Sequence, residues 1–179
     1  MSVDRVVAPR GNRVCKGEGQ LFAAVLFLDI DGVLHPVDAG EDEFFGGPQM
    51  EQLHRIVEAS GAQVVLSSTW RLSPVHMRQA TERLEAVSML LKPQGKTPNL
   101  QHHGRAAEIR AWLDDHPCER WVAIDDLPLD EELPAEHVVR TEPFRGLTAE
   151  AACEAIGKLG HSSELPQTMS TRPGPYSRR

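Results

Sequence analysis

The sequence predicts an α/β fold with a single parallel sheet of about five strands flanked by helices. Short apolar runs alternate with longer segments in which apolar residues recur at helical spacing. This pattern is typical of strands joined by right-handed helical crossovers. The first run, residues 23–28, is six apolar residues long without a break, as expected for a strand buried on both faces.

The segment after the first strand is expected to be a flap followed by a helix. Residues 37–47 contain three glycines and four acidic residues, with Phe44 and Phe45 as an apolar anchor. The helix is expected to begin near Pro48, because proline is favoured in a first helical turn. Gly61 suits a cap at its C-terminal end.

The middle of the chain predicts a second strand over residues 63–66 and a second helix. Ser73 and Pro74 have the order of an N-cap and a first helical residue, so this helix is expected to begin there. Residues 88–91 are expected to form a short third strand, and residues 92–103 a loop with two prolines and one glycine.

The last part of the chain repeats the alternation of helix and strand. The expected elements are a helix over residues 104–115, strands over residues 121–124 and 137–141, and a helix from Thr148 as N-cap to Gly160 as C-cap.

The length of 179 residues and the composition, 40% hydrophobic and 25% charged, are those of one globular domain. We expect this domain over residues 22–160, between a flexible arm over residues 1–21 and a disordered tail over residues 161–179. No insertion is long enough for a second domain.

The net charge is −7, and it is unevenly spread. The two end segments each carry +2, so residues 22–160 carry −11. A domain of this sign does not attract nucleic acid through its overall field, and contact with nucleic acid would need local positive charge.

The three cysteines are far apart, odd in number and without a Cys-x-x-Cys spacing, which indicates reduced thiols. Residues 1–21 lack the apolar region of a signal peptide, and no apolar run approaches the ~18 residues that would span a bilayer. We therefore expect a cytoplasmic protein without a membrane partner. No obligate protein partner is evident.

Polar residues follow three of the expected strands directly. Asp29 and Asp31 follow the first, Ser67 and Ser68 follow the second, and Asp125-Asp126 follow the fourth. Parallel strands present their carboxyl ends at one edge of a sheet, where open α/β folds bind ligands. The three clusters are therefore expected to meet in one crevice.

A phosphate ester would give each cluster a task. Asp29 is the candidate nucleophile, and Asp31 is the candidate proton donor, with a pKa that crowding by Asp29 is expected to raise. Ser67 offers a hydroxyl to a phosphoryl oxygen. Ser68 and Gly32 are further candidates for substrate binding.

A divalent cation would be needed to bring two anionic groups together, and Mg²⁺ prefers hard oxygen ligands. The candidate ligands are the carboxylates of Asp29, Asp125 and Asp126 and the backbone carbonyl of Asp31.

The expected site also needs a positive charge for the phosphoryl oxygens. Arg105 lies in the first turn of the helix before the fourth strand, which begins at the same edge as the strand ends. Lys96, in the preceding loop, is the alternative, and both stay open on the sequence.

The other aromatic and histidine residues have simpler interpretations. The three tryptophans are expected in packing positions, and His102-His103 in a solvated loop without a third metal ligand. His35 lies near the acidic turn, but its position alone does not favour a substrate contact.

The motifs together resemble the haloacid dehalogenase (HAD) superfamily, and in particular the HAD domain of Swiss Army Knife RNA repair proteins, over about residues 22–160. The resemblance is carried by Asp-Ile-Asp-Gly-Val-Leu at 29–34, Ser-Ser-Thr-Trp-Arg at 67–71, Gly-Arg-Ala-Ala-Glu-Ile at 104–109, Trp-Val-Ala-Ile-Asp-Asp at 121–126 and Gly-Leu-Thr at 146–148.

This resemblance implies a Rossmann-like sheet, Mg²⁺ and phosphatase chemistry. Asp31 matches the second acid of the phosphatases in the superfamily, whereas Val33 replaces the threonine often found there. The segment after the first motif is too short for a large cap domain. Uncapped members tend to act on large substrates, so a large or exposed phosphate ester such as an RNA or DNA end is implied.

Two other functions compete with a phosphohydrolase. A non-catalytic module would keep the fold and bind a phosphate or nucleotide. A receiver domain also uses an acid pair, an accepting Asp and a Lys, but its acid pair comes first in the chain, whereas Asp125-Asp126 comes last here.

Overall fold

The computed structural model describes residues 21–160. Five parallel strands form one sheet in the order β3-β2-β1-β4-β5, so the first strand of the chain lies at its centre. The strands are β1 (Val25–Leu28), β2 (Gln63–Leu66), β3 (Gly95–Lys96), β4 (Trp121–Asp125) and β5 (Val138–Arg140). This is the single Rossmann-like sheet that the sequence predicts.

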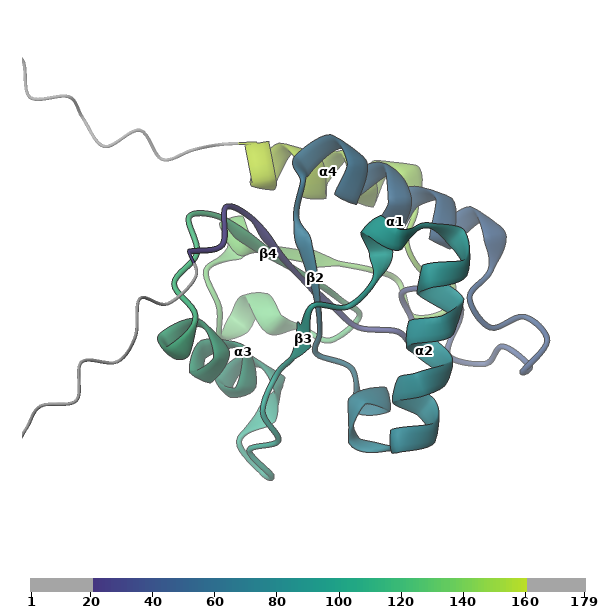
Figure 1. The fold of residues 1–179 in the computed structure, drawn as a ribbon, viewed down its shortest axis with the longest axis horizontal. Coiled ribbons are helices and arrows are strands. Elements are labelled where there is room, and N and C mark those ends of the chain that lie inside the picture. The colour runs from purple at the N-terminus through teal and green to yellow at the C-terminus, as the bar shows by residue number, and fades with distance from the viewer. Residues whose placement is uncertain (1–20, 161–179) are drawn as a thin grey trace, which may run out of the picture.

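Four α-helices cover the two faces of the sheet. They are α1 (Gly47–Ser60), α2 (Pro74–Val87), α3 (Gly104–Asp115) and α4 (Ala149–Gly160). Figure 1 shows α1 and α4 side by side on one face and α3 on the other. Four short 3₁₀ helices complete the described chain: η1 (Thr69–Leu72), η2 (Met89–Leu91), η3 (Leu129–Glu131) and η4 (Ala135–His137).

Strand β1 is wholly buried because each of its faces belongs to a separate core. Leu26 and Leu28 pack with α1, α2 and α4, whereas Val25 and Phe27 pack with α3 on the opposite side. Side chains alternate across a strand, so a strand between two helical layers must be apolar at every position. The unbroken apolar run of the sequence is thereby explained.

Three of the four caps predicted from the sequence are confirmed, and the C-cap at Gly160 was wrong. Gly61 has a left-handed backbone after α1, and the Ser73 hydroxyl accepts a hydrogen bond from a backbone N–H of α2. Thr148 accepts from the Ala151 N–H in the same way, while Gly160 is the last residue of α4 rather than a cap beyond it.

The prediction of a strand over residues 88–91 was wrong. Met89–Leu91 form the 3₁₀ helix η2, and the third strand is Gly95–Lys96, inside the segment expected to be a loop. The Ser88 hydroxyl accepts from the Leu90 N–H and closes a turn, which overrides the apolar character of the segment. Pairing with β2 makes Gly95–Lys96 a strand, and that contact is not local in sequence.

No helix within residues 21–160 is long and apolar enough to cross a membrane. Cys118 and Cys153 are free thiols, as expected. The expected N-terminal arm, with Cys15, and the C-terminal tail lie essentially outside the described residues.

Candidate active site

Polar side chains from neighbouring strands form a row at the carboxyl edge of the sheet. The backbone ladder continues one residue past β1, β2 and β3, so that the N–H groups of Asp29, Ser67 and Thr97 each donate to the strand beside them. Asp125 ends β4 in the same row. The convergence of strand ends predicted from the sequence is therefore present in the structure.

Gly32 allows the turn after β1 to bring its chain against Asp126. Its φ is +71°, a left-handed conformation that glycine adopts without strain. A Cβ at this position would lie 2.8 Å from the side chain of Asp126. The Thr141 hydroxyl donates to the Gly32 carbonyl at 2.7 Å, which ties the turn to the end of β5. Gly32 thus shapes the site, and its contact with substrate remains a prediction.

Arg105 joins two of the acids. It lies in the first turn of α3, and its Nη1 pairs with Asp29 Oδ2 and, at 2.6 Å, with Asp125 Oδ2. All three side chains are nearly or wholly buried. Between the two basic candidates, the structure brings Arg105 to the acids.

The charges in this buried group alter one another. Burial and the neighbouring Asp29 raise the pKa of Asp125 to about 7, although Arg105 opposes the change. Burial and Asp29 also raise the pKa of Asp126. Burial disfavours the charge of Arg105, but Asp29 and Asp125 outweigh it and raise the pKa of Arg105. The negative charge of the three acids therefore exceeds the positive charge that Arg105 alone supplies.

Three carboxylates are close enough to share a metal ion. Asp29, Asp125 and Asp126, which we call the strand-tip cluster, each place an oxygen within 4.8 Å of the others. Asp29 Oδ1 is buried and has no hydrogen-bond partner in the described part of the chain, so this oxygen is available to a ligand. Oxygen donors of this kind suit Mg²⁺. The carboxylate of Asp31 is outside the cluster, and ligation by its backbone carbonyl stays a prediction.

The two serines after β2 are both buried but differ in their partners. The Ser67 hydroxyl has none within residues 21–160, although buried polar groups are normally paired. The Ser68 hydroxyl accepts from the Trp70 N–H and caps η1. Ser68 therefore has a local structural role, and its predicted contact with substrate has no further support here.

Asp31 is held by two rings that the sequence did not single out as its partners. His35 Nε2 lies 3.0 Å from Asp31 Oδ1, and Trp70 Nε1 lies 3.0 Å from both carboxylate oxygens. The Phe45 N–H faces His35 Nδ1 at 3.5 Å, which places the ring proton on Nε2, toward Asp31. We call His35 and Trp70 the Asp31 clamp.

The expectation of a raised pKa for Asp31 was wrong. The hydrogen bond from His35 lowers the pKa of Asp31, and Trp70 and Arg105 act in the same direction against partial burial. The side chain of Asp31 is also 46% exposed, so water supports its charge. Hydrogen bonds to the carboxylate therefore outweigh its partial burial.

Aromatic contacts connect the Asp31 clamp to the flap, residues 37–47. The rings of Phe44 and His35 stack with centroids 4.4 Å apart, and Phe45 packs edge-on against Trp70 at 5.4 Å. Trp70 is thus a packing residue, as expected, and also a hydrogen-bond donor. The spacing of His35 four residues after Asp31 was the sequence signal for the clamp, but nothing local placed Trp70 there.

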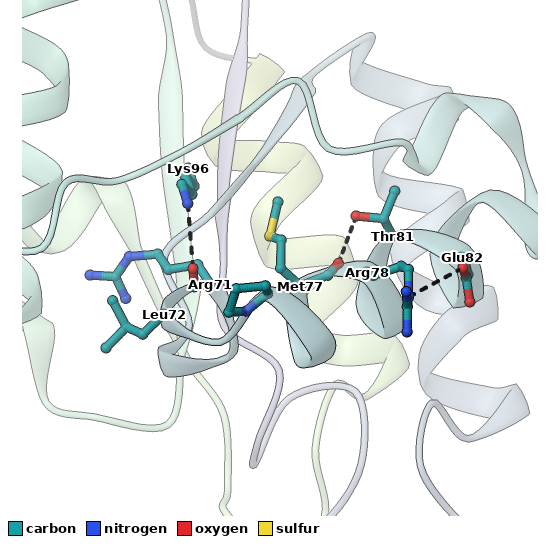
Figure 2. Close-up of a pocket in the computed structure, with 8 residues that line it drawn as sticks. Arg71, Leu72, Met77, Arg78, Thr81, Glu82 and Lys96 are labelled. Atoms are coloured by element: carbon teal, nitrogen blue, oxygen red, sulfur yellow. Dashed lines mark hydrogen bonds and ion pairs between the residues drawn. The ribbon is translucent and has the colours of Figure 1, made fainter.

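Lys96 lies at the end of β3, outside the acidic group. Lys96 is an exposed residue, and its ammonium group donates to the backbone carbonyl of Arg71 at 3.5 Å (Figure 2). It has no acidic partner within residues 21–160. The predicted contact of Lys96 with substrate would therefore involve a part of the substrate that lies away from the acidic residues.

Arg71 is a buried arginine whose role the sequence did not reveal. Its guanidinium donates to the carbonyls of Ser67 and Ser68 at 2.8 Å each and pairs with Glu108 of α3. It also donates to the carbonyls of Thr97 and Pro98. Arg71 therefore ties the chain after β2 to the chain after β3 and to α3, which keeps Ser67 in place.

A family model described as the HAD domain in Swiss Army Knife RNA repair proteins matches residues 25–152. The matched range contains every residue of the site described above. No curated protein and no solved structure gave a match.

Proposed function

From the premise that this chain belongs to the family of HAD domains in Swiss Army Knife RNA repair proteins, we propose that it is a Mg²⁺-dependent phosphohydrolase acting through an aspartyl-phosphate. The proposed substrate is a large or exposed phosphate ester, such as the phosphate at an RNA or DNA end. Support for a large substrate comes from the short connection between β1 and α1, which leaves no room for a cap domain.

The observation that carries the proposal is a pair of buried, unpaired oxygens. Within residues 21–160, Asp29 Oδ1 and Ser67 Oγ both lack a hydrogen-bond partner, as does Thr97 Oγ1, and the first two come directly after adjacent strands at the same edge. Buried polar groups are normally paired, so two neighbouring exceptions indicate a place for a ligand. A phosphoryl group fits, because it offers phosphorus to the Asp29 carboxylate and an oxygen to the Ser67 hydroxyl.

In the first step, the Asp29 carboxylate attacks phosphorus and the bond to the leaving oxygen breaks. Arg105 pairs with Asp29 before the attack, and it can then pair with the phosphoryl oxygens as negative charge develops on them. Mg²⁺, held by the strand-tip cluster, would supply neutralisation of the carboxylate and phosphoryl charges.

Asp31 moves the proton in both steps. An anionic phosphoryl group beside Asp31 favours its protonated form, which donates to the leaving oxygen. The resulting carboxylate, held by His35 and Trp70, then accepts a proton from the water that attacks the phosphorylated Asp29. That attack releases inorganic phosphate and restores Asp29.

The test measures release of phosphate from 4-nitrophenyl phosphate with Mg²⁺ and with excess EDTA. We expect activity only with Mg²⁺ and its loss in Asp29→Asn, which lacks the nucleophile. Asp114→Asn, an exposed acid on α3, is the matched control and should retain activity. Beryllofluoride with Mg²⁺ should attach at Asp29.

Equal activity with and without metal, or substantial turnover by Asp29→Asn, would contradict this mechanism. Absence of hydrolysis of any ester, together with binding of phosphate or nucleotide, would favour the non-catalytic module.

A further inference from the structure

Two hollows lie side by side on the β3 side of the acidic site. The nearer hollow, of about 230 Å³, is bounded by Arg105, Thr69, Asn99 and Leu127 among others. The outer hollow, of about 460 Å³, is bounded by Lys96, Pro74, Met77 and Arg78 (Figure 2). Arg71 and Leu72 border both, so the two hollows adjoin, and Arg105 of the site borders the nearer one; we call the two hollows together the path.

We propose that this path binds the single-stranded nucleic acid that carries the terminal phosphate, and it thereby extends the proposed function. The phosphate would be held at Asp29, and the nucleotides behind it would lie first in the nearer hollow and then in the outer one.

The chemistry of the outer hollow suits a phosphodiester backbone. Lys96 donates to the backbone carbonyl of Arg71 and has no acidic partner within the described chain. Arg78 has only a 3.9 Å contact with Glu82, and both of these side chains are more than 70% exposed. An exposed ion pair of that length holds its members weakly, so Arg78 can turn to a phosphate.

The borders of the path also offer apolar surface to nucleotide bases. Leu72 is 51% exposed and Leu127 is 43% exposed, although both are large apolar residues. The side chain of Met77 faces the outer hollow between Arg71 and Arg78 (Figure 2). Proteins that bind single-stranded nucleic acid without sequence preference combine cationic side chains, which contact the backbone, with other side chains that contact the faces of the bases.

Arg71 forms the floor of the path and is not itself a ligand for the strand. Its side chain is buried, and its donors are committed to backbone carbonyls and Glu108. This fixed floor keeps Leu72 and the segment around Lys96 in constant positions, which lowers the entropic cost of binding.

The flap should repel the same ligand. The flap, residues 37–47, carries four acids and no base, and its acids are exposed. A polyanion that enters with its terminal phosphate at Asp29 is therefore favoured over the hollows and disfavoured over the flap.

The experiment compares a 5′- or 3′-phosphorylated ten-nucleotide single strand with 4-nitrophenyl phosphate, using the full chain. In Arg78→Glu and Lys96→Glu we expect the kcat/KM for the oligonucleotide, divided by that for the aryl phosphate, to fall about tenfold at low salt. The fall should come from KM. Arg83→Glu, the same charge reversal on α2 outside the hollows, should leave the ratio within about twofold.

Binding of a fluorescent oligonucleotide, measured by anisotropy, separates the two proposals. Weaker binding in Arg78→Glu and Lys96→Glu supports the path even if no ester is hydrolysed. An unchanged ratio and unchanged binding in both variants would overturn the path while leaving the phosphohydrolase intact. Equal losses in Arg83→Glu would also overturn it, because they would indicate only a general effect of charge.

Discussion

Asp31 and Asp125 are both acids at the carboxyl edge of one sheet, yet their surroundings shift their pKa values in opposite directions. Asp31 is half-exposed and receives N–H groups from His35 and Trp70, which lower its pKa. Asp125 has no exposed surface and shares Arg105 with Asp29, and its pKa is raised to about 7. Hydrogen bonds thus keep Asp31 a carboxylate until an anionic phosphoryl group is bound beside it, whereas a cation would relieve the excess negative charge around Asp125.

The largest effect should follow from removing the charge of Asp125. Asp125→Asn takes one oxygen anion from the strand-tip cluster, so we expect kcat on 4-nitrophenyl phosphate to fall about 10²–10³-fold at fixed Mg²⁺. A titration with Mg²⁺ checks this, and the variant should need far more metal. Asp130→Asn, an exposed acid in η3, is the control. If Asp125→Asn needs no more Mg²⁺ than the unaltered protein, Asp125 does not hold the metal ion.

Removing the charge of Asp31 should have an effect that depends on the leaving group. Asp31→Asn lacks the proton donor, so turnover of a ribose phosphate should fall about 10²-fold or more, and turnover of an aryl phosphate about tenfold. The ratio of the two rates is the measurement. If both substrates suffer equally, Asp31 does not donate a proton to the leaving group.

A smaller effect should follow from loosening the Asp31 clamp. Trp70→Phe keeps the ring but removes one N–H to the carboxylate, and His35→Leu removes the other. Loss of one hydrogen bond to a charged group should lower turnover of a ribose phosphate about tenfold. His35→Gln should recover part of the loss, because its amide can donate in place of Nε2.

Trp112→Phe is the matched control for the clamp, since Trp112 is a buried tryptophan in the core beneath α3. It should leave the ratio of ribose-phosphate to aryl-phosphate turnover unchanged. If Trp112→Phe and Trp70→Phe alter this ratio equally, the clamp acts only through general packing.

The smallest effect concerns stability and pH. The folded pKa of Asp125, about 7, is above its ordinary value of 3.8, so folding favours the protonated form. The free energy of unfolding of metal-free protein should therefore fall as pH rises between about 4 and 7. Urea unfolding in EDTA measures it.

Asp125→Asn should flatten this slope, and Mg²⁺ should restore more stability at pH 7.5 than at pH 5. Asp31 acts with the opposite sign: its lowered pKa contributes stability that is lost as pH falls below its ordinary value. A slope that persists in Asp125→Asn would show that another group is responsible.

The sequence by itself determined which strand ends supply the polar residues of the site. Apolar runs that end in Asp29, Ser67 and Asp125 are local patterns, and parallel strands bring their ends to one edge whatever the details. The caps at Gly61 and Ser73 are local as well, so the helices they limit were predicted correctly. The position of Arg105 followed from the same geometry, because a helix that precedes a strand begins at the edge where strands end.

Only the tertiary structure decided the state of Asp31, the third strand and the function of Arg71. The donors to Asp31 include Trp70, 39 residues away, and their hydrogen bonds reversed the expected direction of its pKa. Gly95–Lys96 form a strand because β2 offers an open edge. These outcomes depend on contacts between distant segments, and local propensity carries no information about which segments will meet.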